Sequence, residues 1–201
     1  SNDNPLIDPV NLRVLHGGHF YGGHIAQAMD SLKIMIANIA DLMDRQFAQL
    51  VDYKMNNGLP RNLTGATAER LPLNHGFKAV QIGVSAWTAE ALKQTLSASI
   101  FSRSTECHNQ DKVSMGTIAA RDASRVIVLT EQVIAALCCA SVQAIHLKGL
   151  DGQLAEVLAA FKIWVLQTFD YVVEDRPLQH ELQQLVDRLE NLELLSSELV
   201  R

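Results

Sequence analysis

The densest group of side chains that could do chemistry lies in the middle of the chain, at residues 104–111. This stretch reads Ser-Thr-Glu-Cys-His-Asn-Gln-Asp, so it offers carboxylates, a thiol, an imidazole and two amides close together. Glu106 and Gln110 are four residues apart, and a helical conformation would place them on one face. A simpler interpretation is that Ser104 or Thr105 caps a following helix. On composition alone, the capped turn is favoured over an active site.

A second candidate is the glycine-rich stretch at residues 17–23, Gly-Gly-His-Phe-Tyr-Gly-Gly. It has neither the dinucleotide-binding fingerprint nor the Gly-Lys-Ser/Thr of a phosphate loop, and no strand is predicted before it. Its glycines let the backbone pass close to another group, while Phe20 presents a flat apolar face. Apolar residues and turn residues alternate through residues 3–24. This pattern is typical of an irregular segment held in a groove by packing.

Three histidines, His16, His19 and His24, fall in the same region. No cysteine or carboxylate accompanies them at the spacing of metal ligands. Hydrogen-bonded loop histidines are therefore the favoured interpretation, and no metal site is predicted.

Helical periodicity dominates the rest of the chain. Apolar residues recur every three or four positions from Ile25 to about Tyr53, and Asn57-Gly58 with Pro60 ends the pattern. Further helices are predicted at about 76–100, 111–147, 154–173 and 178–200, with a long loop at 57–75. In the last helix, leucines at 178, 182, 185, 189, 192 and 199 lie close to a heptad seam.

The fold class is therefore all-α. We expect an elongated bundle of about five helices, residues 25–201, preceded by an irregular glycine-rich segment, residues 1–24. No convincing strand and no internal repeat are present. The apolar stripes are wider than one antiparallel partner needs, and the longest helices would overhang a core built by one chain. Both features predict self-association as a dimer or tetramer.

Composition excludes several classes of protein. The chain has 201 residues, a hydrophobic fraction of 48%, a charged fraction of 19% and a net charge of −5. These values describe a globular chain, and the scattered basic residues predict no nucleic-acid surface. No uncharged run reaches the roughly 18 residues of a membrane span, so no membrane partner is predicted. Cys138 and Cys139 lie in an apolar stretch, which predicts buried thiols in a reducing compartment. Since no signal peptide is recognised at the start of the sequence, a cytoplasmic location is expected.

Several segments, taken in order, resemble the aromatic amino-acid ammonia-lyase and aminomutase superfamily. They are Asp3-Asn4-Pro5-Leu6, Gly17-Gly18-His19-Phe20, Asn56-Asn57-Gly58-Leu59-Pro60 with Asn62-Leu63, His108-Asn109-Gln110-Asp111 with Val113-Ser114-Met115, and Asp175-Arg176-Pro177-Leu178. Their order and spacing match over almost the whole chain. The match covers the C-terminal part, less than half, of a full-length enzyme of that family.

The resemblance implies the roles of four residues. Phe20 corresponds to the aromatic residue of the family's Gly-Gly-Asn-Phe motif, which packs beside the electrophile and the substrate. Glu106 corresponds to the catalytic carboxylate near the substrate amine. Asn109 and Gln110 correspond to amides that support the electrophile and the aromatic substrate pocket. His19 stands where the family usually has Asn.

The resemblance also implies the cofactor and the reaction. The family's electrophile, 4-methylidene-imidazole-5-one (MIO), forms from an internal Ala-Ser-Gly, and its catalytic tyrosine base lies upstream. This chain has no Ala-Ser-Gly, the nearest match being Ala140-Ser141-Val142. The implied parent is a homotetrameric lyase with active sites built from several subunits, and the chain alone is expected to be inactive with no cofactor of its own.

The substrate implied is an aromatic amino acid. Gln110 stands where histidine-specific members carry Glu, so phenylalanine or tyrosine is favoured over histidine. An aminomutase, which returns ammonia to the β-carbon, and a non-catalytic helical assembly module are the alternatives. An Ala-Ser-Gly in the parent would favour the enzyme over the module.

Overall fold

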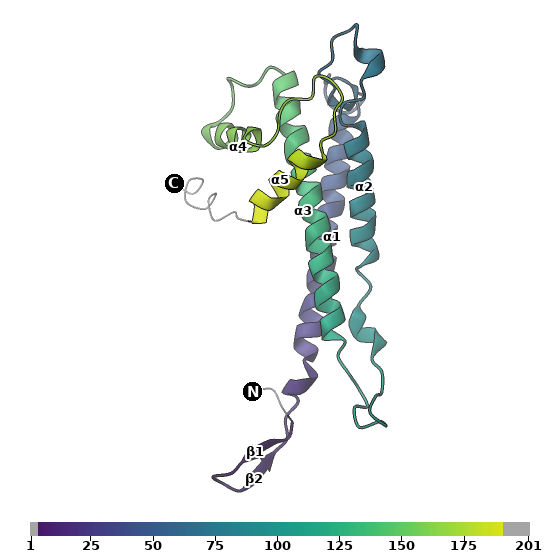
Figure 1. Cartoon of the computed structure of the whole chain (residues 1–201), viewed down its shortest axis with the longest axis vertical. Coiled ribbons are helices and arrows are strands. Elements are labelled where there is room, and N and C mark those ends of the chain that lie inside the picture. Colours follow the sequence, from purple (N-terminus) through teal and green to yellow (C-terminus); the bar gives the residue numbers. More distant parts are fainter. Residues whose placement is uncertain (1–3, 191–201) are drawn as a thin grey trace.

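Three long helices form the body of the molecule. The structure, a computed structural model, describes residues 4–190. Helices α1 (Gly23–Val51), α2 (Lys78–Lys93) and α3 (Gly116–Leu147) run up, down and up beside one another (Figure 1). At 1.5 Å per residue, α1 is about 44 Å long and α3 about 48 Å. Five α-helices lie within the described residues, so the predicted elongated all-α bundle is confirmed.

Small and apolar side chains explain why these helices pack closely. The buried faces of α1 and α3 are rich in alanine, which lets the helix backbones approach each other. At one end of the bundle, Phe47, Phe77 and Phe169 fill the core with almost no exposed area. The ring centroids of Phe47 and Phe77 are 6.3 Å apart, and those of Phe77 and Phe169 are 6.2 Å apart.

Two shorter helices, α4 (Glu156–Leu166) and α5 (Gln179–Glu190), cover that end of the bundle (Figure 1). Polar contacts, some of them buried, fix the segment between α4 and α5 against the connection between α1 and α2. Gln143 on α3 donates to the carbonyls of Leu63 and Val172 and accepts the N–H of Val172. The carboxylate of Asp175 accepts the backbone N–H groups of His75 and Gly76 at 2.7 and 2.8 Å. These bonds hold the long 52–77 connection, which contains two short 3₁₀ turns, Arg61–Leu63 and Leu71–Leu73.

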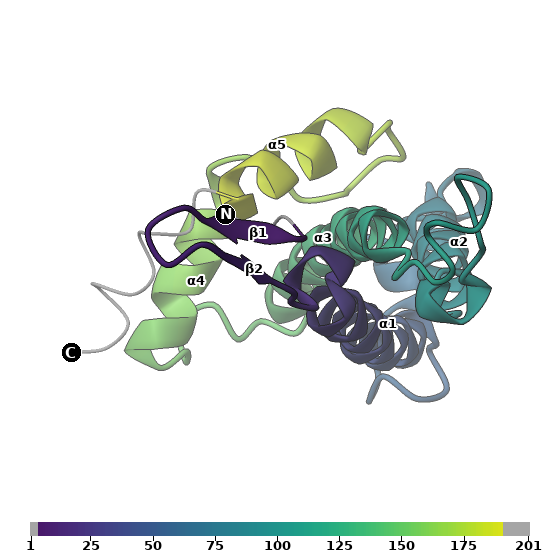
Figure 2. The same ribbon diagram turned by 90° about the horizontal axis from the view of Figure 1, so that it is seen from below.

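The N-terminal segment differs from the sequence prediction. Strands β1 (Leu6–Asp8) and β2 (Arg13–Leu15) pair antiparallel, with Leu6 opposite Leu15. The hairpin extends away from the bundle axis (Figure 2), and its apolar side chains are exposed. The glycine-rich residues 16–22 form no α-helix or strand, as predicted, but residues 6–15 form a hairpin, and the expected packing of this segment in a groove is not seen within the described residues. The turn forms because the Asp8 carboxylate accepts the N–H groups of Val10 and Asn11, a local contact that alternation of apolar residues does not reveal.

Four helix boundaries also differ. Helix α2 ends at Lys93 instead of near residue 100, and a 3₁₀ turn, η4 (Ala98–Phe101), follows. Helix α3 begins at Gly116 instead of near residue 111, because Met115 before it has a left-handed backbone (φ 57°). Helix α4 begins at Glu156 and ends at Leu166, a shorter span than the predicted 154–173. In the last helix, residues 192 and 199 of the leucine seam lie outside the described residues.

Helix α3 is the one described helix with the length and composition of a membrane span. It lies between α1, α2 and α5, and 56% of its apolar window is buried inside the molecule. Such burial is typical of the central helix of a bundle. Burial raises the pKa of Cys138 on this helix to about 11 and that of Cys139 further. Cys139 is buried, as predicted, and Cys138 is half-buried; both thiols stay protonated at neutral pH.

Candidate functional site

The predicted site residues all lie at one end of the three-helix bundle. The N-termini of α1 and α3 are at this end, together with the connection from α2 to α3 (Figure 1). The segments before the two helices adjoin, since a Cβ placed on Gly22 would lie 3.8 Å from the Ser114 hydroxyl oxygen. The glycine-rich stretch and the polar stretch, about ninety residues apart in sequence, are thus brought to the same end.

The polar stretch forms a tight turn rather than a helix or a cap. Thr105 and Gln110 pair as an antiparallel bridge, with N···O distances of 2.8 and 3.3 Å. The Asn109 N–H donates to the Glu106 carbonyl at 2.9 Å, and the Asn109 side-chain amide donates to the Glu106 carboxylate at 3.3 Å. The hydroxyl of Ser102 accepts the Val113 N–H at 3.0 Å and closes the loop at its base.

The turn has an uncommon backbone. Glu106, Cys107 and His108 have φ values of 51°, 53° and 71°, three successive non-glycine residues in the left-handed region. Each such residue costs roughly 1–2 kcal/mol. A cost of this kind is more often found at functional sites than in connecting loops. The capped turn favoured by composition was therefore wrong, because α3 has no side-chain cap, and residues 104–111 are not helical.

The left-handed turn points its polar groups outward. Glu106 and Asn109 are exposed, and Gln110 is half-buried. Within residues 4–190, no Lys or Arg forms an ion pair with Glu106, so its carboxylate is available as an acceptor. Phe20 lies in a short 3₁₀ turn just before α1 and is 62% exposed. The site residues thus share one end of the bundle.

A buried charge network supports the α2–α3 connection, and the sequence analysis did not identify it. Lys33 on α1 is fully buried, and its ammonium lies 2.7 Å from the Leu96 carbonyl, 3.0 Å from Asp30 and 3.3 Å from Asp122 on α3. Asp30 accepts the N–H groups of Ala98 and Ser99 at 3.0 and 3.2 Å and the Ser99 hydroxyl at 2.8 Å. The sequence does contain one sign of this network: Asp30 and Lys33 are opposite charges three residues apart inside the apolar stripe of α1.

Acid should weaken this network. Burial alone would raise the pKa of Asp30, but the Ala98 N–H, the Lys33 ammonium and the Ser99 donors together lower it from 3.8 to about 2. The unfolded chain therefore binds a proton at a higher pH than the folded chain. We expect this contribution, about 2 kcal/mol, to be complete above pH 4 and to be lost as the pH falls from about 4 to 2. Urea unfolding over that range measures it. The Asp30→Asn variant should show a flatter pH dependence, and an equal slope in the two proteins would contradict the assignment.

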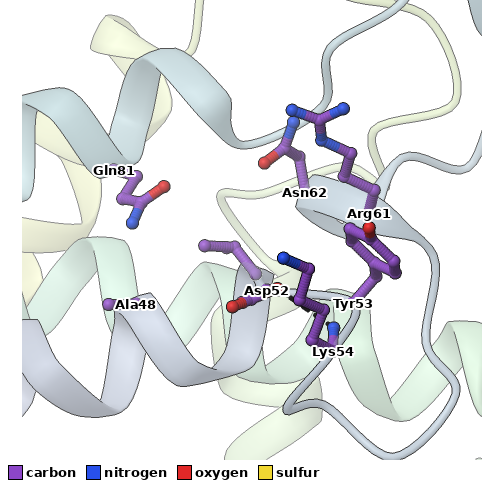
Figure 3. Close-up of a pocket in the computed structure, with 8 residues that line it drawn as sticks. Ala48, Asp52, Tyr53, Lys54, Arg61, Asn62 and Gln81 are labelled. Carbon is purple, nitrogen blue, oxygen red and sulfur yellow. Dashed lines mark hydrogen bonds between the residues drawn. The ribbon is translucent and has the colours of Figure 1, made fainter.

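Two cavities within the described residues lie elsewhere. One of about 450 Å³ is at the other end of the bundle, where α1 ends; Asp52, Lys54, Arg61, Asn62 and Gln81 are among the residues that line it (Figure 3). The other, of about 480 Å³, lies between the start of α2 and Asp175 with Arg176. None of the predicted site residues lines either one. Within residues 4–190 no group of three metal-ligating side chains is present.

Comparison with known proteins places these observations in a family. The family model described as aromatic amino acid lyase matches residues 1–163. The chain is 37% identical to a tyrosine ammonia-lyase of Cereibacter sphaeroides over 93% of its own length and 36% of that protein. It is 31% identical to a histidine ammonia-lyase of Bacillus subtilis, over 97% of the chain and 37% of that protein. The chain thus spans little more than a third of these relatives.

A solved structure gives the same result. The tyrosine aminomutase of Streptomyces globisporus superposes with a TM-score of 0.88 at 30% identity, over 98% of this chain and 37% of that one. Lyases and aminomutases therefore share the helical arrangement described above. With the family model matching most of its residues, the chain belongs to the aromatic amino acid lyase family.

Proposed function

We propose that the chain is the C-terminal part of an ammonia-lyase that eliminates ammonia from an aromatic L-amino acid to give an aryl acrylate. The observation that carries the proposal is the left-handed turn, which presents Glu106, Asn109 and Gln110 at the end of the bundle where Phe20 also lies. The relatives described as ammonia-lyases support the reaction class.

In this reaction the Cα–N bond breaks and a proton leaves the β-carbon. The Glu106 carboxylate is free of cationic partners within the described chain, so it can bind the substrate ammonium, accept a proton from it, and return that proton to the nitrogen as the Cα–N bond breaks and ammonia leaves. The amides of Asn109 and Gln110 can orient neighbouring oxygen and nitrogen atoms without adding charge. Phe20 offers an exposed ring against which an aromatic substrate packs.

The MIO group belongs to the proposal for the full-length parent. The described residues can lie beside this group, because two uncharged amides and an aromatic ring can hydrogen-bond to and pack against a small planar heterocycle. They cannot form the group, because this chain contains no Ala-Ser-Gly. When bound, that group supplies the electrophile that activates the amino acid. The base that removes the β-proton is likewise proposed to lie outside this chain.

We favour phenylalanine or tyrosine over histidine. Gln110 is a neutral amide whose carbonyl accepts from the Thr105 hydroxyl at 3.4 Å. A carboxylate at this position would pair with an imidazole, whereas an amide favours an uncharged aryl ring. The test is the full-length enzyme with Phe, Tyr and His, followed by the absorbance of the acrylate product. Turnover of His alone would overturn the substrate assignment, and no acrylate from any of the three would overturn the lyase.

An aminomutase is the second candidate, because a tyrosine aminomutase is among the solved structures most similar to this chain. Chiral chromatography of the products separates the two. An aryl acrylate and free ammonia indicate a lyase, and a β-amino acid indicates an aminomutase. We also propose a cytoplasmic location, with which the three free thiols of the described chain agree.

The fragment by itself should be inactive. No Ala-Ser-Gly is present in its 201 residues, so the proposed electrophile cannot form from them. We expect no acrylate absorbance above the blank when the purified chain is mixed with Phe, Tyr or His at any pH. The full-length enzyme at the same molar concentration is the control. Acrylate formed by the fragment would show that the missing part is not needed.

The fragment should also self-associate as a dimer or tetramer. Large apolar side chains are exposed along the outer faces of α1 and α3, and at the arm formed by β1 and β2. Burial of such a surface against another copy is favourable, and monomers rarely leave one open. Light scattering during size-exclusion chromatography at tens of micromolar should give a multiple of 22.2 kDa. A monomeric mass would contradict the prediction.

A further inference from the structure

We propose that the buried network of Lys33, Asp30 and Asp122 positions the left-handed turn that carries Glu106, and that the rate of the reaction depends on it. This inference rests on the proposed function. It assigns these three side chains as positioning residues, which act on the substrate only through the turn.

The first step is that the network fixes one short segment of backbone. Residues 96–99 follow α2, and the last two of them begin the 3₁₀ turn η4, so their backbone groups lie outside the hydrogen bonding of α2. Lys33 replaces that bonding by donating to the Leu96 carbonyl, and Asp30 replaces it by accepting two backbone N–H groups. Four hydrogen bonds therefore join three residues of the segment, Leu96, Ala98 and Ser99, to α1.

The second step is that the network joins the three parts that frame the site. Asp30 and Lys33 lie on the first three turns of α1, shortly after Phe20. Asp122 lies on the second turn of α3, shortly after the loop that carries Glu106. Lys33 is the only charged side chain of the described residues that contacts both acids, and it is fully buried. Its removal would leave two carboxylates facing each other beneath the connection.

The third step links the anchored segment to the turn. Ser99 is three residues before Ser102, whose hydroxyl accepts the Val113 N–H and closes the loop. Beyond that closure, the hydrogen bonds that hold the turn among the described residues lie within residues 104–110. Its position relative to α1 and α3 is therefore set at its base. A displacement of about 1 Å there would cost on the order of 100-fold in rate if Glu106 acts on the substrate.

A structural role alone would make these residues important for folding without any specific effect on Glu106. The two possibilities are separated by Lys33→Met in the full-length enzyme, with Ser99→Ala as a milder variant that removes one donor to Asp30. The matched control is Gln143→Leu, which removes an equally buried polar side chain at the other end of the bundle. Trypsin cleavage after Arg103 and Lys112, both exposed in this loop, reports the position of the loop independently of activity.

We expect Lys33→Met to speed cleavage at those two sites and to lower kcat about 10-fold to 100-fold with KM nearly unchanged. Ser99→Ala should also speed loop cleavage and lower kcat, but by a smaller factor. Gln143→Leu should lower the melting temperature but change neither loop cleavage nor kcat below that temperature. In a Glu106→Gln background, Lys33→Met should lower kcat by less than about 2-fold, because its effect passes through Glu106.

Two results would overturn the inference: normal loop cleavage and normal kcat in the folded variants, or an equal loss of kcat with and without Glu106→Gln. If Lys33→Met does not fold, Ser99→Ala decides by the same criteria. If Glu106→Gln alone keeps full turnover, the proposed function fails, and loop cleavage still shows whether the network holds the turn.

Discussion

Replacing Glu106 by alanine in the full-length enzyme should lower kcat by roughly 10² to 10⁴, the range found when a group that transfers a proton is removed. The carboxylate lies exposed at the tip of the left-handed turn and contacts only the Asn109 amide among the described side chains. Its removal leaves no cavity and no unpaired buried group. The free energy of unfolding should therefore change by less than about 0.5 kcal/mol.

The control is Glu69→Ala, which removes an exposed glutamate from the 52–77 connection at the other end of the bundle. It should leave turnover unchanged. Acrylate formation gives kcat, and thermal unfolding of the same preparations gives stability. A Glu106 variant with normal turnover, or one that is unfolded, would contradict the proposed role.

Replacing Phe77 by alanine should destabilise the fragment by about 3–5 kcal/mol, the usual cost of deleting a buried aromatic ring. The ring has no exposed area and lies between Phe47 and Phe169, so three elements lose contacts together. These elements are α1, the start of α2 and the segment after α4. Neighbouring rings are themselves packed and can close only part of the resulting cavity.

Urea unfolding at one fixed protein concentration measures this change, because self-association would otherwise shift the midpoint. Phe20→Ala makes the same substitution at a ring that is 62% exposed and should cost less than about 1 kcal/mol. Similar losses at the two positions would mean that the three-ring cluster is not the main core of this end.

Periodicity predicted the long helices well because burial in this fold is decided mainly by helix faces. The stripe from Ile25 to Tyr53 became α1, and the alanine-rich stretch around Cys139 became the most buried part of α3. The ends of the helices were predicted less well. They are set by contacts distant in sequence, as where Asp30 accepts the N–H groups of Ala98 and Ser99 and stops α2 from continuing.

The candidate site shows a similar division. The resemblance to a family identified Phe20, Glu106, Asn109 and Gln110, and folding brings all four to one end of the bundle. Residue types did not reveal the left-handed backbone at residues 106–108, because none of the three is glycine. The roles of these four residues remain predictions that the substitutions above test.

Among residues 4–190, the turn that carries Glu106 is connected to the core at its base, through Ser102 and Val113 and the anchored segment before them. Substitutions at its tip therefore do not disturb helix packing, whereas substitutions in the Lys33 network change both fold stability and the position of the turn. Under the proposed function, exchanges confined to the exposed residues of this turn alter contacts with the substrate at little cost in stability. Over evolutionary time, selection on substrate preference can then act through these loop residues while the bundle stays the same.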